Sequence, residues 1–197
     1  MLMERRLEKI KEGVIELHEI AEECMKIVVG GLKGDNEVRK RLEDLEERAD
    51  LIHADVDYDC VTVLALFQPV ASDLRFVVGM MKISSGYERI TDLALEIGYY
   101  YCDDEKLLEI YEEAINSILK MFELIGKAYN ENADLMKLKA LDNVVDDCYV
   151  KAIDRLKEKC DVENVLIARH LERIGDILGK IGSALIFVNT GRRIRIK

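Results

Sequence analysis

The chain of 197 residues contains no tryptophan and only one proline, and aromatic residues make up just 6% of it. An all-β protein of this length needs more aromatic and β-branched side chains and many more turn residues. Hydrophobic residues account for 49% of the chain and charged residues for 35%, which is enough for one sizeable core or two small ones. The composition therefore favours an all-α protein.

Cysteine is sparse and follows no motif. The chain has no C-x-x-C pair, and its five cysteines are Cys24, Cys60, Cys102, Cys148 and Cys160. An odd, scattered set is typical neither of a disulfide framework nor of a zinc knuckle. We expect these residues to be small buried side chains in a reducing compartment.

The chain also lacks an excess of positive charge, because 39 acidic residues against 29 basic ones give a net charge of −10. This disfavours nucleic-acid binding, which usually needs a basic surface.

The longest largely apolar run, residues 61–67, is far shorter than the roughly 20 residues of a membrane span. The amphipathic N-terminal segment has no signal-peptide core, so we expect a cytoplasmic protein. The last residues of the sequence, 191–197, form a basic tail. This tail either complements a helix C-terminus or makes a partner contact or, at most, a peripheral membrane contact.

Apolar residues recur at helical spacing in almost every long window, and the breaks between these windows predict six helices. A proline suits the first turn of a helix, an aspartate its N-cap and a glycine its C-terminal end. The signals that begin or end helices are Gly30, Gly31 and residues 34–36, then Pro69, Asp103, Asp104, residues 130–134, Asp161 and Gly191. Six helices joined by short loops predict one antiparallel bundle or two bundles of three.

An internal repeat favours two bundles. The segment Lys82–Gly98 aligns with Leu166–Gly182 without a gap and matches it at seven positions, which include both copies of an E-R-I-x-D motif. A repeat of this length is far longer than a solenoid unit and fits the duplication of a three-helix unit. We therefore expect two tandem antiparallel three-helix bundles, the first spanning residues 1–102 and the second residues 103–197.

Four pairs of acidic residues, each with a spacing of four, repeat between the two halves. Residues four apart lie on one face of a helix, so each pair can direct two carboxylates at one point. A cation would relieve the repulsion between them, and hard oxygen ligands suit divalent metals and iron. The pairs are Glu46 with Asp50, Glu88 with Asp92, Asp142 with Asp146, and Glu172 with Asp176.

A solvated, salt-bridged helix face is the alternative interpretation of these pairs. A helical chain with this many acidic residues contains many such pairs by chance. In addition, Arg89 directly follows Glu88, and Arg173 directly follows Glu172. The spacing alone leaves both interpretations open, and the duplication favours metal binding.

Known catalytic patterns are missing. A ferritin-like di-metal site needs Glu-x-x-His on two helices, and none of the three histidines, His18, His53 and His170, follows a glutamate at that spacing. The sequence also contains no phosphate-binding glycine loop, nucleophile elbow or Cys/His signature. We therefore expect no enzymatic activity, and surface or interface roles for the histidines.

Four segments together resemble the PhoU family of phosphate-uptake regulators. They are QPVASDLRF (68–76), ERITD (88–92), ERIGD (172–176) and ALIFVNTGR (184–192). The upstream acidic pairs match the family's E/D-x-x-x-D motif in each half, and the resemblance covers about residues 5 to 192. Within QPVASDLRF, we expect Asp73 in a first helical turn with Arg75 paired nearby.

The resemblance implies two three-helix bundles, a homodimer and a cytoplasmic negative regulator of phosphate uptake and phosphate-starvation signalling. The implied partners are the ATPase of a phosphate ABC transporter and a sensor histidine kinase. Some members of the family bind iron or zinc clusters through the acidic motifs. This implies metal ligation by Glu46, Asp50, Glu88, Asp92, Asp142, Asp146, Glu172 and Asp176. Because Asp142 is one methylene shorter than Glu46, the two metal sites need not be equivalent.

Three hypotheses follow from the sequence. The first is a non-enzymatic regulatory adaptor of phosphate uptake, and a regulator of another ion transporter is a variant of it. The second is a carboxylate-bridged metalloprotein with a hydrolytic, redox or storage role. The third is a helical oligomerisation module, which explains the amphipathic stripes but not the duplicated acidic pairs.

Overall fold

The computed structural model describes residues 2–130, 133–158 and 161–196, and these residues form helices and short connections without any strand. The helices are α1 (Leu2–Leu32), α2 (Asn36–Phe67), α3 (Ala71–Tyr99), α4 (Glu105–Ala128), the 3₁₀ turn η1 (Leu135–Lys137), α5 (Leu138–Leu156) and α6 (Val162–Thr190). The predicted break at residues 130–134 falls between α4 and η1, and residues 131–132 within it lie outside the described part.

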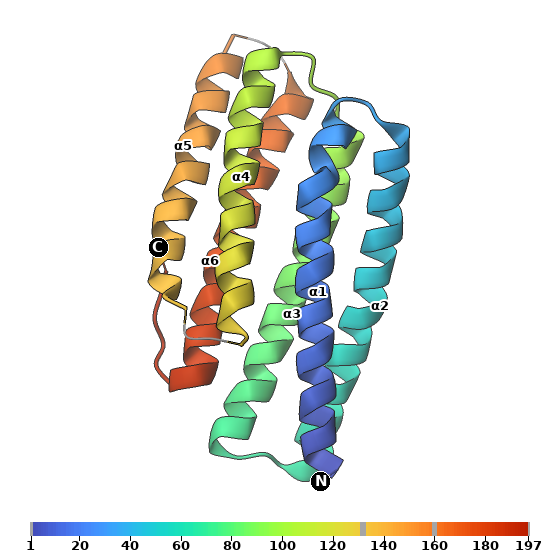
Figure 1. The fold of residues 1–197 in the computed structure, drawn as a ribbon, viewed down its shortest axis with the longest axis vertical. Coiled ribbons are helices and arrows are strands. Elements are labelled where there is room, and N and C mark those ends of the chain that lie inside the picture. The colour runs from blue at the N-terminus through green and yellow to red at the C-terminus, as the bar shows by residue number, and fades with distance from the viewer. Residues whose placement is uncertain (1, 131–132, 159–160, 197) are drawn as a thin grey trace.

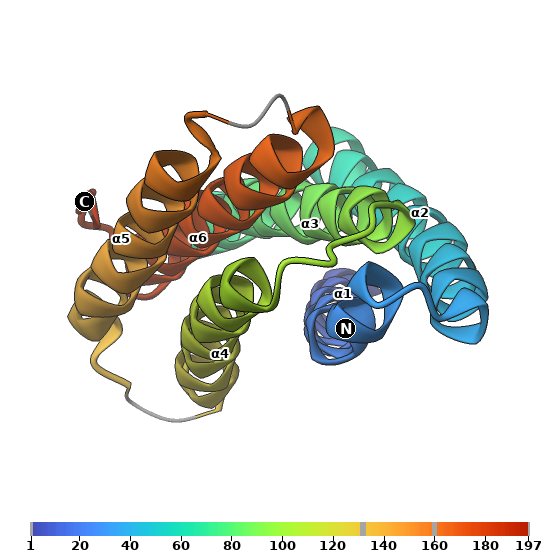
Figure 2. The same ribbon diagram turned by 90° about the horizontal axis from the view of Figure 1, so that it is seen from above.

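The helices form two groups of three that lie side by side (Figure 1). Helices α1, α2 and α3 pack against one another, as do α4, α5 and α6, while α3 contacts α6 and α1 contacts α4 across the junction. Seen from above, α3 and α6 form the junction on one side and α1 and α4 approach each other on the other (Figure 2). The predicted class, two antiparallel three-helix bundles, is confirmed. The boundary between residues 102 and 103 stays a prediction.

Three of the predicted helix ends are confirmed by their caps. The Asp104 carboxylate accepts hydrogen bonds from the backbone N–H groups of Lys106 and Leu107, and the Asp161 carboxylate accepts one from Asn164. These bonds satisfy donors that the first turn of a helix otherwise leaves free. Gly191 ends α6 in the left-handed region with a φ of 72°, where a glycine has no Cβ penalty.

The predicted break at residues 34–36 is confirmed, because α1 ends at Leu32, Gly34 has a φ of 83° and Asp35 caps α2. Two other predicted boundary signals were wrong. Gly30 and Gly31 lie inside α1, and Gly31 is buried in a close contact with Gly98 of α3. Pro69 precedes α3 instead of occupying its first turn: α2 ends at Phe67, and the chain turns through Gln68 at a φ of 45° before α3 begins at Ala71. Pro69 has no backbone N–H to donate, and the connection between α2 and α3 needs no donor at this position.

One continuous apolar core joins the two groups of helices. Its largest fully buried side chains include Tyr87, Tyr111 and Phe122, which come from α3 and α4. The four described cysteines are buried and free, as predicted, and burial raises the pKa of the Cys24 and Cys60 thiols to about 12. Cys160 lies outside the described residues.

The basic tail folds back onto α6. Ile196 is buried, and its backbone N–H donates to Ser183 Oγ at 3.1 Å. The guanidinium of Arg193 lies 5.7 Å from the centre of the Phe187 ring. None of the described helices is long and apolar enough to cross a bilayer.

Candidate functional site

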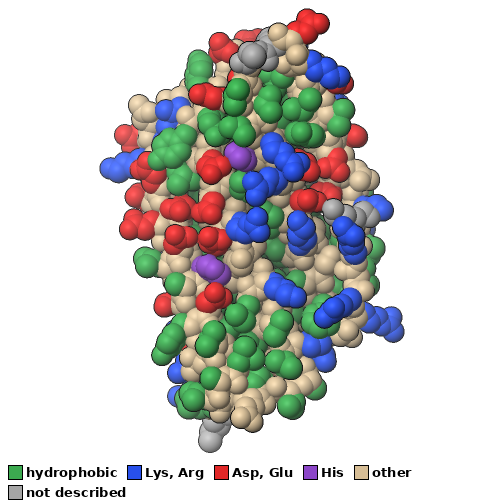
Figure 3. All heavy atoms as spheres, turned by 180° about the vertical axis from the view of Figure 1, so that it is seen from behind, with side chains coloured by type: hydrophobic (Ala, Val, Ile, Leu, Met, Phe, Trp, Pro, Cys, Tyr) green, Lys and Arg blue, Asp and Glu red, His purple; other side chains and the backbone are tan. Residues whose placement is uncertain are grey.

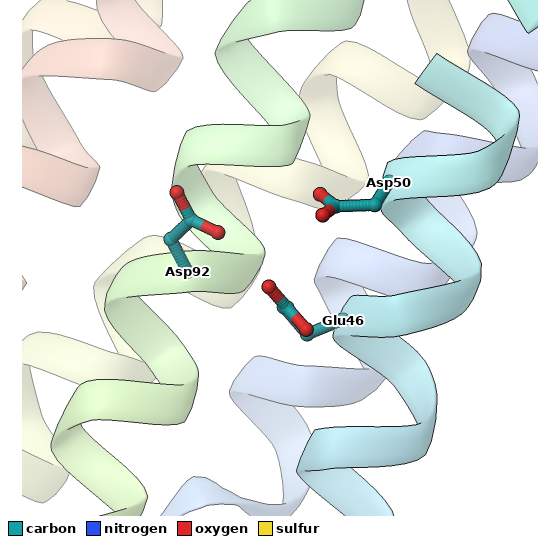
Figure 4. Close-up of side chains that lie close together, drawn as sticks. All are labelled: Glu46, Asp50 and Asp92. Carbon is teal, nitrogen blue, oxygen red and sulfur yellow. The ribbon is translucent and has the colours of Figure 1, made fainter. Parts of the chain in front are cut away.

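Three of the predicted acidic residues converge between α2 and α3. Each of Glu46, Asp50 and Asp92 offers a carboxylate oxygen, and these oxygens all lie within 4.8 Å of one another. Figure 4 shows Glu46 and Asp50 reaching from α2 toward Asp92 on α3. The structure thus brings both members of the pair on α2, Glu46 and Asp50, close to Asp92, the second member of the pair on α3.

Core packing places these side chains at the surface between the two helices. Leu45 and Ala49 are fully or almost fully buried, so the next residues along α2, Glu46 and Asp50, lie at the edge of its buried face. Both members of the pair then point the same way because a spacing of four returns to one face of the helix.

Electrostatics make this group a site of concentrated negative charge. Burial raises the pKa of Glu46, and the carboxylates of Asp50 and Asp92 raise it further. The pKa of Asp92 is also raised, first by burial and then by Asp50 and Glu96, although Arg89 and a hydrogen bond from Glu46 partly oppose the change. A hard divalent cation would relieve this repulsion, so the donor set fits a metal ion.

Glu88 belongs to the same neighbourhood but not to the group of three. Burial and the charges of Asp92 and Asp50 raise its pKa, while His53 and Arg89 lower it. The His53 ring lies on the α2 side, where its Nδ1 is 2.7 Å from the buried Ser84 hydroxyl. The sequence analysis missed this His–Ser contact because it joins two helices.

The four predicted ligands of the second half are arranged differently. Among the residues that the structure describes, no three of Asp142, Asp146, Glu172 and Asp176 bring ligand atoms within 4.8 Å of one another. The Asp142 carboxylate is buried beside α6, so close to Gly175 that a Cβ there would lie 2.9 Å from its Oδ1. Glu172 and Asp176, on α6, instead face basic neighbours.

Two cations pair with the carboxylates on α6. Arg169 donates to Glu172 at 2.8 Å, and Lys180 lies 3.7 Å from Asp176. Burial raises the pKa of Glu172, but Arg169 opposes that shift. The internal repeat places Ser85 and Glu96 where the second half has Arg169 and Lys180. The alignment of the two copies therefore already indicates that the acidic residues of the second half have basic neighbours that the first half lacks.

The surface or interface role expected for His18 was wrong, because this residue is buried in the core, whereas His170 lies where α3 meets α6. Nδ1 of His18 lies 2.9 Å from the Tyr87 hydroxyl in the core, and Nε2 of His170 lies 3.0 Å from Glu96 across the contact between α3 and α6. The expected pairing of Arg75 with Asp73 was wrong. The Arg75 guanidinium instead reaches the end of α6, within 4 Å of where a Cβ on Gly191 would lie.

Fold and site together define a class: all-α proteins of paired three-helix bundles that carry clustered carboxylates on a helix face. The PhoU domain model matches residues 14–100. An Archaeoglobus fulgidus protein named phosphate-specific transport system accessory protein PhoU homolog is 42% identical over 195 residues, covering 98% of both chains. A Thermotoga maritima relative, PhoU homolog 1, is 26% identical and is covered over 90% of its length. The chain belongs to the PhoU family, as its motifs predicted.

Solved structures show the same fold. The crystal structure of PhoU from Pseudomonas aeruginosa matches with a TM-score of 0.81 at 21% identity, over 96% of this chain and 99% of that one. The PhoU regulatory protein from Streptococcus pneumoniae matches with a TM-score of 0.77 at the same identity, over 98% of this chain and 99% of that one. These likenesses support the six-helix architecture over nearly the full length of the chain.

Proposed function

We propose that this protein is a non-enzymatic cytoplasmic regulator of phosphate uptake and phosphate-starvation signalling. It acts negatively, by binding the ATPase of a phosphate transporter, a sensor kinase or both, and it works as a homodimer. The observation that carries the proposal is the near full-length similarity, at 42% identity, to a relative named as an accessory protein of phosphate-specific transport.

Binding regulates such a partner only if it distinguishes between the partner's conformations. A ligand with equal affinity for two states shifts neither population, however tightly it binds. The adaptor must therefore bind the non-transporting or non-signalling state more tightly. A rigid surface made of long packed helices suits this task because it does not reshape itself to fit both states.

Phosphate uptake in living cells tests this role. Deleting the gene is expected to raise the initial rate of radiolabelled phosphate uptake in phosphate-rich medium, where a negative regulator acts. Reintroducing the intact gene should restore the low rate. An unchanged uptake rate would contradict negative regulation, and altered uptake of a different ion alone would indicate a regulator of another transporter.

We also propose that Glu46, Asp50 and Asp92 hold a divalent transition metal, iron or zinc. The support is the convergence of their carboxylates within 4.8 Å and the raised pKa values of Glu46 and Asp92. A bound cation would tie α2 to α3 and fix the shape and charge of this face. Glu88, Asp142, Asp146, Glu172 and Asp176 are weaker candidates, because none of them belongs to a converging group of three among the described residues. Arg169 and Lys180 also neutralise part of the charge of Glu172 and Asp176.

Metal content after equilibrium dialysis distinguishes the two halves. The double variant Asp50→Asn with Asp92→Asn is expected to lose most of its bound iron or zinc, because it removes two of three converging ligands. The matched variant Asp146→Asn with Asp176→Asn should lose less. A control with Glu19→Gln and Glu109→Gln alters exposed carboxylates on α1 and α4 and should bind as the wild type does. Equal loss in the control, or no saturable binding by the wild type, would contradict the assignment.

A further inference from the structure

A basic cleft lies between α3 and α6, beside the acidic group. We define it by its charged lining residues, which are Lys82, Arg89, Arg169, Arg173, Asp176 and Lys180. Its volume is about 470 Å³, within the range of small-molecule sites. Five cations and one carboxylate thus surround a hollow in a protein whose net charge is −10. Figure 3 shows Lys and Arg side chains gathered in the middle of this face, next to the Asp and Glu side chains.

Three of the five cations form no close ion pair within the described residues, although the charge of Arg89 acts on Glu88 and Asp92. Arg169 and Lys180 are paired with Glu172 and Asp176 on their own helix. Within the described ranges, Lys82, Arg89 and Arg173 form no ion pair with any carboxylate. Holding like charges around one cavity costs free energy unless an anion balances them, and a cleft concentrates their field.

The internal repeat brings equivalent arginines to this cleft from both halves. Arg89 on α3 and Arg173 on α6 occupy matching positions in the two copies of the E-R-I-x-D motif. The contact between α3 and α6 makes both of them line the same hollow. Two guanidinium groups offer planar sets of donors, a geometry that binds phosphoryl oxygens bidentately.

A second hollow of about 540 Å³ continues from the basic cleft. The two share Lys82, Lys180 and Ala184. The second is lined by apolar side chains that include Leu74, Val78 and Phe187, and at its edge also by Arg75, Arg193 and Arg195. A ligand spanning both would place anionic groups among the arginines and an apolar or aromatic part against these side chains. Inorganic phosphate has no such second part and is far smaller than the combined space.

We propose that the basic cleft binds a small organic molecule carrying two or more phosphoryl groups, of the nucleoside diphosphate or triphosphate class. The phosphoryl groups lie between Arg89 and Arg173, and the organic part lies over Leu74 and Val78. This site is separate from the group of Glu46, Asp50 and Asp92, and the proposal does not rest on the regulation of phosphate uptake.

Calorimetric titration of the purified full chain tests this proposal, after bound metal and chelator have been dialysed away so that a metal cannot recruit the anion. ADP is expected to bind saturably at physiological ionic strength, pyrophosphate more weakly and inorganic phosphate more weakly still. The variant Arg89→Gln with Arg173→Gln should weaken ADP binding about a hundredfold or more, because it removes two charged donor groups from the phosphoryl oxygens. A control with Arg5→Gln and Lys40→Gln removes the same charge from α1 and α2, away from the cleft, and should bind ADP as the wild type does.

The apolar hollow is tested by Leu74→Ser, which changes an exposed side chain and leaves the core intact. This variant should weaken ADP binding and leave pyrophosphate binding unchanged. The proposal is overturned if ADP fails to saturate, if inorganic phosphate binds as tightly as ADP, or if the control loses as much affinity as the arginine variant. Equal affinity for pyrophosphate and ADP would overturn the role of the apolar hollow.

Discussion

Single residues at the junction of the two helix groups set part of the pH response of this protein. His18 on α1 contacts Tyr87 of α3 at 2.9 Å, and the Tyr87 hydroxyl lies 2.9 Å from that of Tyr129, just beyond α4. The ring of Phe122 also packs edge-on against the histidine. Burial lowers the pKa of His18 from 6.5 to about 4, so the ring is neutral in the folded protein at physiological pH.

This lowered pKa predicts a loss of stability on acidification. The unfolded chain takes up a proton on His18 near pH 6.5, whereas the folded chain does so only near pH 4. The contribution of the buried neutral ring is therefore complete above pH 6.5 and disappears as the pH falls toward 4, with a loss of about 3 kcal/mol over that window.

Urea denaturation between pH 7 and pH 4 measures this effect as a difference between proteins. The variant His18→Gln should show a smaller decrease in unfolding free energy than the wild type, because glutamine does not titrate. His53→Gln is the matched control on α2 and should retain the steep wild-type decrease. Parallel pH profiles for wild type and His18→Gln would contradict this explanation.

At the scale of helices, glycines decide how closely two elements approach. A Cβ on Gly31 of α1 would lie 2.8 Å from the Cα and 2.9 Å from the carbonyl oxygen of Gly98 on α3. Both atoms belong to backbone, which cannot move aside as a flexible side chain can. Gly179 of α6 differs, because the atom nearest to its Cβ position is the Ile196 carbonyl oxygen at 3.6 Å.

Alanine at these two positions should change stability in opposite directions. Gly31→Ala is expected to destabilise the protein by about 1–3 kcal/mol, because the methyl group forces α1 and α3 apart. Gly179→Ala is expected to stabilise it by about 0.5–1 kcal/mol, because it lowers the entropy of the unfolded chain without a clash. Urea denaturation of both variants measures this difference, and a stabilising Gly31→Ala would refute the proposed close contact.

The sequence correctly predicted the features that depend only on residues close together in the chain. The caps at Asp104, Asp161 and Gly191 were predicted because a cap depends on residues within one turn. Gly31 was misinterpreted as part of a helix end because its close contact is with Gly98, far along the chain. Arg75 was misassigned for the same reason, since its side chain reaches the end of α6.

The same distinction applies to the candidate site. The spacing of Glu46 and Asp50 predicted two carboxylates on one helix face. Figure 4 shows these two side chains on the same face of α2, pointing toward α3. Spacing could not show that Asp92, rather than Glu88, comes closest to them, because that depends on how α3 packs. Nor could it show that Arg89 and Arg173 line one cleft, since that depends on the contact between α3 and α6.

At the scale of the whole molecule, the two halves each contain three packed helices but carry different surfaces. The first half gathers carboxylates between α2 and α3, whereas Arg169 and Lys180 balance Glu172 and Asp176 in the second. An acidic face and a basic cleft thus lie next to each other on one side of the protein (Figure 3). We expect this polarised side to distinguish partners, because charge complementarity contributes more to specificity than to affinity.

Affinity capture from the native host tests whether this protein binds the machinery of phosphate uptake. Tagged protein is recovered from cells grown in phosphate-rich and in phosphate-starved medium, and the co-eluting proteins are identified by mass spectrometry against an untagged control. We predict enrichment of a phosphate-transporter ATPase or a sensor kinase, stronger in phosphate-rich medium. Recovery of neither under both conditions would contradict the claim.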